Sequence, residues 1–378
     1  MVSNPSSEMR NKCVLSVMGM ESSKYGGLEH FNVFLSQRLF QHGYRSVFVY
    51  ESYPADQRFV DDLQESEARI VVSDARHHPI RFCIDFIKLL RKYRPTIVHA
   101  HFTKARFYAI PIARLFGIRK LFFTVHSSMD SLETIHPWTR IWYRFANRYA
   151  KVITVSNQIA STYLSNWPES TVKRIYLGVI NPVYERSSSR RSLGIPEDCT
   201  MLLTIANFNY IKGLDVLIRA IARLKQDGSW NRGDKLFIVG QPEADQQELS
   251  ALIHALDVGN EVVSVGISNR AAEYLASADI YIQPSRSEGI SLSLMEAASY
   301  SLPLIGSKVG GIPEVIRDGE NGILVPPEDD LQLMRAISGM MCDYEMRRRM
   351  GNSSFITYHN TFTIEKGVKQ TLDYYNLE

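Results

Sequence analysis

Two carboxylates, Glu288 and Glu296, lie on either side of seven residues in the segment 285–327. An apolar run before them predicts a short buried strand, and Gly289 allows the backbone to turn into a helix that begins near Ser291. The first-turn N–H groups of such a helix have no intrahelical partners and favour an anion nearby. Glu296 falls among apolar residues, where an unpaired carboxylate is costly to bury. The alternative for Glu296, an ordinary surface position on an amphipathic helix, fits this context less well.

Several glycines and polar residues follow the ends of predicted strands. They are Gly26-Gly27, His99, His101, His126, Asn207 with Lys212, Gly240, Gly266-Ile267 and Glu288-Gly289. Ligands of open parallel sheets bind beyond the carboxyl ends of the strands. We therefore expect these positions to line one cleft.

Each of these positions also has a simpler interpretation. Lys212 precedes a predicted helix, where its charge is unfavourable unless an anion lies nearby, but it could be a solvated loop lysine. Gly26-Gly27 would let a phosphate approach the backbone, although turn geometry alone could require these two glycines. His126 ends an apolar strand, where a single histidine is more often structural than catalytic.

Short apolar runs alternate with amphipathic stretches of about 10 to 15 residues over most of the chain, which predicts parallel sheets covered on both faces. The pattern lapses over 183–199, a Ser-, Arg- and Pro-rich segment that we interpret as an interdomain linker. The sequence thus predicts two doubly wound α/β domains, at 1–182 and 200–360. A final helix at about 361–378 is long enough to pack back across the junction onto the first domain.

The composition is that of a globular protein, with 378 residues, 45% hydrophobic and 22% charged. Its four cysteines form no C-x-x-C pair, so neither a zinc site nor a disulfide framework is indicated, and reduced cytosolic thiols are the simplest account. Residues 1–180 contain 24 Lys/Arg and 14 Asp/Glu, and residues 81–120 alone contain 10 and 1. This basic half suits an anionic surface or substrate, and no nucleic-acid-binding motif accompanies it.

Motifs spread over nearly the whole chain resemble those of one family, the retaining glycosyltransferases of family 4, which have the GT-B fold. They are GGLE, VHAH, TVH and VSN in the first half, and KGLDVLIRA, FIVG, VSVG, ADIYIQPSRSEG, GGIPE and NGILVP in the second. The resemblance implies two Rossmann-like domains facing a central cleft, with the acceptor bound by the first domain and a nucleotide-sugar donor by the second.

Roles of the second-domain acids follow from this resemblance. Glu288 would lie beside the transferred sugar. The backbone N–H groups of Gly289, Ile290 and Ser291 would face the sugar and the diphosphate. Glu296 would accept hydrogen bonds from the nucleotide ribose hydroxyls, which explains a carboxylate in an apolar helix.

Other positions contact the donor by the same resemblance. Lys212 would neutralise the departing diphosphate, and His126 would contact the sugar near the reaction centre. Many family members carry an Arg five residues before the Lys; here that residue is Asn207, so more of the leaving-group charge rests on Lys212. Two backbone pairs complete the predicted donor site: Gly26-Gly27 at the phosphates and Gly266-Ile267 at the base.

The implied activity is transfer of a hexosyl or N-acetylhexosaminyl group, with retention, from a UDP- or GDP-sugar to a glycan or lipid-linked acceptor. Assembly of cell-surface polysaccharide or lipopolysaccharide is the expected setting. No Asp-x-Asp pair occurs in the chain, so we expect no metal and no other cofactor. The alternatives are a GT-B-fold nucleotide-sugar epimerase and a non-catalytic nucleotide-sugar-binding protein.

A basic aromatic stretch could bring the first domain to a membrane. Three arginines recur every four residues beside four aromatic residues: Arg140, Arg144 and Arg148 with Trp138, Trp142, Phe145 and Tyr149. Such a helix could meet anionic lipid. The alternative places the aromatics in the core and the arginines in solvent. The chain has no obvious export signal or long apolar span, so we expect a cytoplasmic protein, peripheral on the cytoplasmic face of the membrane under the first interpretation.

Overall fold

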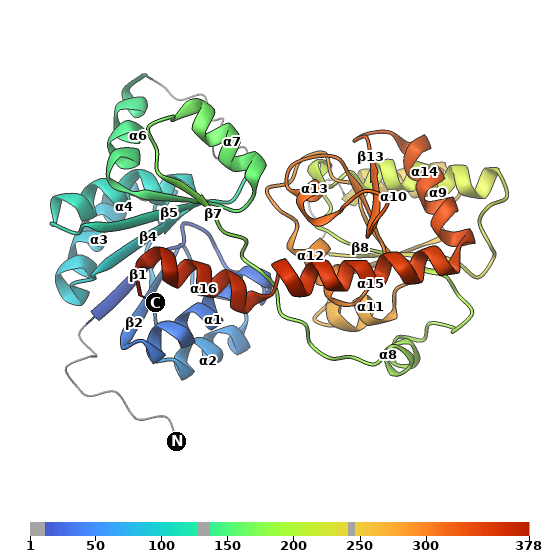
Figure 1. Cartoon of the computed structure of the whole chain (residues 1–378), viewed down its shortest axis with the longest axis horizontal. Helices are drawn as coiled ribbons and strands as arrows, with labels where there is room; N and C mark the ends of the chain where they lie inside the picture. Colours follow the sequence, from blue (N-terminus) through green and yellow to red (C-terminus); the bar gives the residue numbers. More distant parts are fainter. Residues whose placement is uncertain (1–11, 128–136, 241–245, 378) are drawn as a thin grey trace. The chain divides into compact units, whose positions relative to one another are not determined.

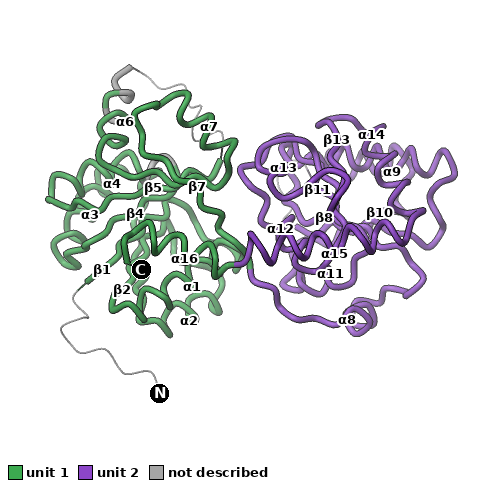
Figure 2. Tube along the Cα trace, in the orientation of Figure 1, with its two compact units in different colours: residues 1–179, 364–378 green, residues 180–363 purple. Residues whose placement is uncertain are grey.

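The computed structural model describes residues 12–127, 137–240 and 246–377. The chain forms two compact units, residues 1–179 with 364–378 and residues 180–363 (Figure 2). The last helix, α16 (Ile364–Tyr375), belongs to the first unit. No helix in the described part of the chain is long and apolar enough to cross a membrane.

Unit 1 contains a seven-stranded sheet in the order β3-β2-β1-β4-β5-β6-β7. All neighbouring strands are parallel. The strands are β1 (Lys12–Val17), β2 (Tyr44–Tyr50), β3 (Arg69–Val72), β4 (Ile97–His101), β5 (Lys120–Val125), β6 (Lys151–Thr154) and β7 (Val172–Arg174). The central strands β1, β4 and β5 are buried along almost their whole length, because helices cover both faces of a parallel sheet.

The helices of unit 1 divide between the two faces of this sheet. They are α1 (Gly27–Gln41), α2 (Gln57–Glu65), α3 (Pro79–Tyr93), α4 (Thr103–Leu115), α6 (Pro137–Tyr149), α7 (Asn157–Asn166) and α16. Helices α1, α2 and α16 pack together, and α3, α4 and α6 form a second group on the opposite face (Figure 1). Ile364 N–H donates to the carbonyl of Val179, which ties the start of α16 to unit 1.

Unit 2 contains a six-stranded parallel sheet in the order β10-β9-β8-β11-β12-β13. The strands are β8 (Met201–Ile205), β9 (Lys235–Val239), β10 (Val262–Gly266), β11 (Ile280–Gln283), β12 (Leu304–Ser307) and β13 (Gly322–Val325). The helices are α8 (Arg186–Leu193), α9 (Leu214–Gln226), α10 (Gln246–Ala255), α11 (Ala271–Ser277), α12 (Leu292–Ser299), α13 (Ile312–Val315), α14 (Asp330–Cys342) and α15 (Tyr344–Thr361). Two doubly wound parallel-sheet units, as predicted from the alternation of runs, are thus present.

The segment 183–199, expected to be a linker, has fixed structure within unit 2. It forms α8, and the fully buried side chain of Arg190 donates to the carbonyls of Ser277, Pro196, Glu197 and Cys199. Arg190 also pairs with Asp279 at 2.7 Å. The segment lacks hydrophobic periodicity because charge-assisted hydrogen bonds, not apolar burial, hold α8 in place.

Candidate functional site

Four loops of unit 2 converge beyond the carboxyl ends of β8, β9, β11 and β12, and glycines let their backbones touch. A Cβ on Gly213 would lie 2.1 Å from the carbonyl oxygen of Pro284, and one on Gly310 would lie 1.9 Å from that of Glu288. Both glycines have positive φ, +65° and +57°, which other residues rarely adopt. The loop that carries Lys212 is therefore fixed against the loop that carries Glu288.

Glu288 is the buried centre of this site, with 8% of its surface exposed. Its Oε1 accepts hydrogen bonds from Lys212 Nζ at 2.7 Å, Ser285 Oγ at 2.8 Å and Gln283 Nε2 at 3.1 Å. The side chain of Lys212 is 27% exposed, so the pair is only partly screened by water. The sequence suggested that Lys212 needs an anion nearby, because its charge lies close to the positive N-terminal end of a helix. In the structure the carboxylate of Glu288 supplies that negative charge.

Gln283 orients the carboxylate from the end of β11. Its Oε1 accepts from Tyr281 OH at 3.0 Å, Ser291 Oγ at 3.2 Å and Ser293 Oγ at 3.3 Å. With the carbonyl end occupied in this way, the amide end of Gln283 faces Glu288. Burial raises the pKa of Tyr281, so its hydroxyl keeps the proton that it donates. Gln283 was not predicted as a site residue, although a polar residue that closes a buried apolar strand is a visible signal in the sequence.

Arg286 clamps the loop that carries Lys212. Its two Nη atoms donate to Asp215 at 2.7 and 2.8 Å, and its Nε donates to Glu328 at 2.8 Å. The guanidinium also stacks 3.9 Å from the ring centroid of Tyr210. Burial alone would raise the pKa of Asp215, but the hydrogen bonds and charge of Arg286 outweigh it and hold that pKa below its usual value. Sequence spacing could not predict this cluster, because Arg286 lies 42 to 76 residues from its partners Glu328, Asp215 and Tyr210.

Helix α12 begins at Leu292, as predicted, and Ser291 caps it by accepting the N–H of Leu294 at 3.2 Å. Gly289 and Ile290 lead into this first turn directly after Glu288 and are half-buried. Glu296 lies one turn further along α12 and is also half-buried. The loop after Glu288 and the first turn of α12 thus bring the predicted donor-binding backbone next to the Lys212–Glu288 pair.

The remaining predicted residues of unit 2 lie at the same sheet edge. Gly240 packs against the loop of Asn207, since a Cβ on Gly240 would lie 3.2 Å from the backbone nitrogen of Asn207. Gly240 N–H donates to the carbonyl of Gly266, which ends β10 with φ of +76°. Ile267 follows with 74% of its side chain exposed, an unusual position for a large apolar residue. An exposed apolar side chain at a ligand-binding edge is available to pack against a flat ring.

The predicted glycines of unit 1 open its first helix. Gly26 precedes α1 and Gly27 is its first residue. The buried carboxylate of Glu29 accepts from the N–H of Gly26 at 3.1 Å and from Ser22 Oγ at 3.0 Å. Glu29, part of the GGLE motif, therefore stabilises the turn that leads into α1.

Histidines gather at the carboxyl ends of β4 and β5 in unit 1. His126 Nε2 lies 3.1 Å from His101 Nδ1, and its ring stacks on Phe102 with centroids 4.5 Å apart. His99 bonds Thr124 Oγ1 at 2.8 Å and the hydroxyl of Tyr375 on α16. Burial, reinforced by His126, lowers the pKa of His99 to about 3, and burial lowers the pKa of His101 well below its usual value. Both rings are therefore neutral at physiological pH, and His101 holds His126 by a hydrogen bond.

The comparisons with known proteins agree with this architecture. Solved structures of the same two-unit GT-B fold cover nearly the whole chain. Anabaena Alr3699/HepE in complex with UDP-glucose matches 96% of this chain and 98% of that chain, with a TM-score of 0.79 and 19% identity. WaaG, a glycosyltransferase involved in lipopolysaccharide biosynthesis, matches 95% of this chain and 99% of that chain, with a TM-score of 0.75 and 15% identity. The fold is therefore GT-B, as predicted.

Family models then define the class of protein. Residues 25–180 match the glycosyltransferase family 4 model, and residues 185–373 match that of glycosyl transferases group 1. The chain belongs to this family of glycosyltransferases, which confirms the resemblance. An uncharacterized glycosyltransferase, MJ1607, of Methanocaldococcus jannaschii is 29% identical over 66% of this chain and 64% of its own length. The N-acetyl-alpha-D-glucosaminyl L-malate synthase of Bacillus anthracis is 28% identical over 72% of each chain.

Proposed function

We propose that this glycosyltransferase moves a hexosyl or N-acetylhexosaminyl group from a UDP- or GDP-sugar to an acceptor hydroxyl, with retention at the anomeric carbon. The observation that carries the proposal is the buried carboxylate of Glu288, held by Lys212 directly before the first turn of α12. The N–H groups of that turn and the ammonium of Lys212 are the groups that stabilise a diphosphate. A neighbour of the same fold binds UDP-glucose, which supports a nucleotide-sugar donor.

In the proposed reaction, the bond between the anomeric carbon and a phosphate oxygen breaks, and the acceptor oxygen bonds to the same face of that carbon. The acceptor proton passes to the departing phosphate oxygen. Charge accumulates on the diphosphate as the bond breaks, and Lys212 shares its three donors between Glu288 and that charge. Glu288 is thereby a positioning group for Lys212 as well as a neighbour of the sugar.

The other predicted site residues complete the proposed donor complex. Glu296 accepts from the ribose hydroxyls, Ile267 packs beside the base, and Asn207 donates a neutral hydrogen bond where many relatives carry an Arg. Gly26-Gly27 and His126, from unit 1, contact the phosphates and the sugar. The hydrogen bond with His101 orients the ring of His126 for this contact.

We further propose that the reaction needs no divalent metal, because Lys212 and the N–H groups of α12 would stabilise the charge of the diphosphate and the chain has no Asp-x-Asp pair. Turnover is then unchanged by EDTA and by added Mg²⁺ or Mn²⁺. A loss of activity in EDTA that Mn²⁺ restores would contradict this part of the proposal.

The acceptor is proposed to be a glycan or a lipid-linked saccharide of cell-surface polysaccharide or lipopolysaccharide assembly, and WaaG offers a structural precedent. Contact with the cytoplasmic face of a membrane would follow from the basic aromatic helix α6. On this helix Arg144, Arg148 and Tyr149 are exposed and Phe145 is half-buried; the side chains of Trp138, Arg140 and Trp142 lie outside the described residues. Sedimentation with vesicles with and without anionic lipid tests this, and absence of binding at low salt would refute it.

A donor panel tests the function itself. Nucleotide release from UDP- and GDP-sugars is followed with and without candidate glycan acceptors. A transferase releases nucleotide only when an acceptor is present, an epimerase converts the donor without an acceptor, and a binding protein does neither. Lys212→Ala and Glu288→Ala should lose turnover about a hundredfold or more. The matched controls Lys225→Ala and Glu320→Gln change solvent-facing ion pairs of the same unit and should retain it.

A further inference from the structure

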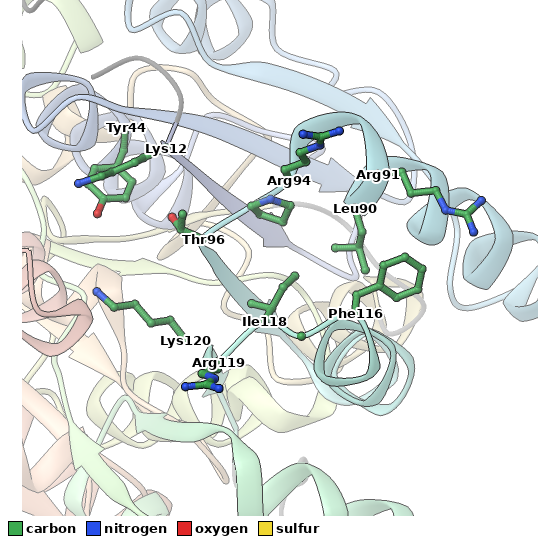
Figure 3. A pocket seen from close by; sticks show the side chains of 12 residues that line it. Lys12, Tyr44, Leu90, Arg91, Arg94, Thr96, Phe116, Ile118, Arg119 and Lys120 are labelled. Atoms are coloured by element: carbon green, nitrogen blue, oxygen red, sulfur yellow. The ribbon is translucent and has the colours of Figure 1, made fainter. Parts of the chain in front are cut away.

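A cavity lies in unit 1, at the edge of the sheet where the strands begin. It has a volume of about 700 Å³ and is lined from the starts of β1, β2 and β5, the residues before β4, and the ends of α3 and α4 (Figure 3). Lys120 begins β5 here, whereas His126 follows the other end of the same strand. Six residues of strand span about 20 Å, so this cavity is separate from the predicted sugar contact of unit 1.

The cavity is strongly basic. Five of its lining residues are cationic and none is acidic: Lys12, Arg91, Arg94, Arg119 and Lys120. Within the described ranges, none of the five forms an ion pair with a carboxylate. Their partners are neutral: Lys120 donates to the carbonyl of Tyr375 at 2.9 Å, and Lys12 and Arg91 lie 5.5 and 5.9 Å from the ring centroids of Tyr44 and Phe116.

Helix dipoles explain only part of this concentration of charge. Arg91 lies in the last turn of α3 and Arg94 is its C-cap residue, where a cation is stabilised by the carbonyl end of the helix. Lys12 and Lys120 instead begin strands, and Arg119 lies between α4 and β5. These positive charges line the same cavity as those of Arg91 and Arg94. A bound anion would reduce the repulsion between them.

The walls between the cations are apolar. Leu90 is buried, Ile118 is half-buried, and Phe116 keeps 42% of its side chain exposed. Figure 3 shows these three side chains and the cationic ones around the same hollow. A fully hydrated inorganic ion would gain nothing from such walls, whereas an anionic group attached to an apolar or ring-containing body would bury part of that body.

We propose that this cavity binds a phosphate-bearing ligand whose uncharged part packs against Leu90, Phe116 and Ile118. Phosphate is favoured over a carboxylate because it offers three oxygens and about two charges, which suits a lining with five cations and no acid, and arginine binds it through two parallel hydrogen bonds. The ligand is either the phosphate headgroup of a lipid or a soluble organic phosphate. The site is independent of the donor site proposed for unit 2, so either proposal can fail while the other stands.

Two probes separate the sources. Inorganic phosphate and phenyl phosphate are titrated calorimetrically into the full chain, and the chain is sedimented with phosphatidylcholine vesicles with and without phosphatidic acid. The variant R94Q/R119Q removes two exposed cations of the cavity, with R119Q alone as a milder form. The matched control R38Q/R69Q removes two exposed arginines of unit 1 that do not line it.

We expect the wild type and R38Q/R69Q to bind a probe equally, and R94Q/R119Q to bind it about tenfold or more weakly, because charge-assisted hydrogen bonds are lost. Phenyl phosphate should bind more tightly than inorganic phosphate. Binding only to vesicles with phosphatidic acid, weakened in R94Q/R119Q, identifies a lipid headgroup in the cavity, because this variant leaves α6 unchanged. Binding of phenyl phosphate in solution, weakened in the same variant, identifies a soluble ligand. Equal binding of every probe by the wild type and R94Q/R119Q, or no binding of any probe, would overturn the proposal.

Discussion

The pairing of Lys212 with Glu288 can be measured as a coupling free energy. Lys212→Met leaves the carboxylate of Glu288 buried with only Ser285 and Gln283 as donors. Losing a hydrogen bond from a charged donor costs about 1.5 to 3 kcal/mol. The lysine side chain is 27% exposed, so water can partly replace its hydrogen bond to Glu288. We therefore expect the free energy of unfolding of unit 2 to fall by about 2 kcal/mol.

The double variant Lys212→Met/Glu288→Gln should recover much of this loss. A neutral amide at 288 can still accept from Ser285 and Gln283 and leaves no unpaired buried charge. We expect Glu288→Gln alone to cost about 1 kcal/mol and the double variant little more, which gives a coupling free energy of about 1 to 2 kcal/mol.

Hydrogen exchange measured by mass spectrometry is the suitable assay, because a chain of two units need not unfold in one step. Protection of peptides from β8, β11 and α12 reports the stability of unit 2, and peptides from β1 and β4 of unit 1 serve as the internal control. If the effects of the two single variants simply add in the double variant, the ion pair does not stabilise the site and this reasoning is wrong.

Three further predictions concern the supports of the site. Gly310→Ala should lower the free energy of unfolding of unit 2, measured by heat or urea, by about 3 kcal/mol or more, because its Cβ would lie 1.9 Å from the carbonyl oxygen of Glu288. Gly319 also has a positive φ but faces open space, so Gly319→Ala should lower it by about 1 kcal/mol. Equal losses in the two variants would contradict this prediction. Arg286→Lys should speed hydrogen exchange of the 207–213 loop about tenfold, because the bidentate bond to Asp215 and the stacking on Tyr210 are lost, and Arg219→Lys, which changes an exposed partner of the same Asp215, should not. His99 should contribute a loss of about 1.4 kcal/mol per pH unit to the stability of unit 1 as the pH falls from 6.5 towards about 3, because unfolded His99 binds a proton that the buried ring does not, and buried His101 adds a loss in the same direction. An unchanged slope in His99→Gln would remove His99 as a cause.

Much of the fold could be predicted because strand and helix periodicity are local properties of the sequence. The parallel sheets and the start of α12 just after Ser291 follow from short windows of residues. The segment 183–199 could not be recognised as part of unit 2, because Arg190 is held by carbonyls and by Asp279, 89 residues away. Hydrophobic patterning carries no signal of such contacts.

The candidate site was predicted unevenly for the same reason. Residue types at strand ends pointed to Lys212 and Glu288, but not to their contact across 76 residues, which supplies the anion that Lys212 needs. Gln283 and Arg286 were overlooked because their roles consist of holding other side chains. A residue that acts through its neighbours has no spacing rule of its own, and only the tertiary structure reveals it.

The most direct test of the central claim is the position of a nucleotide diphosphate bound to this chain. A crystal structure with UDP or GDP should show a phosphate oxygen within hydrogen-bond distance of Lys212 Nζ and of an N–H group among residues 289–291, with the ribose on Glu296. A nucleotide bound away from the first turn of α12, with Lys212 still paired to Glu288 alone, would contradict the account.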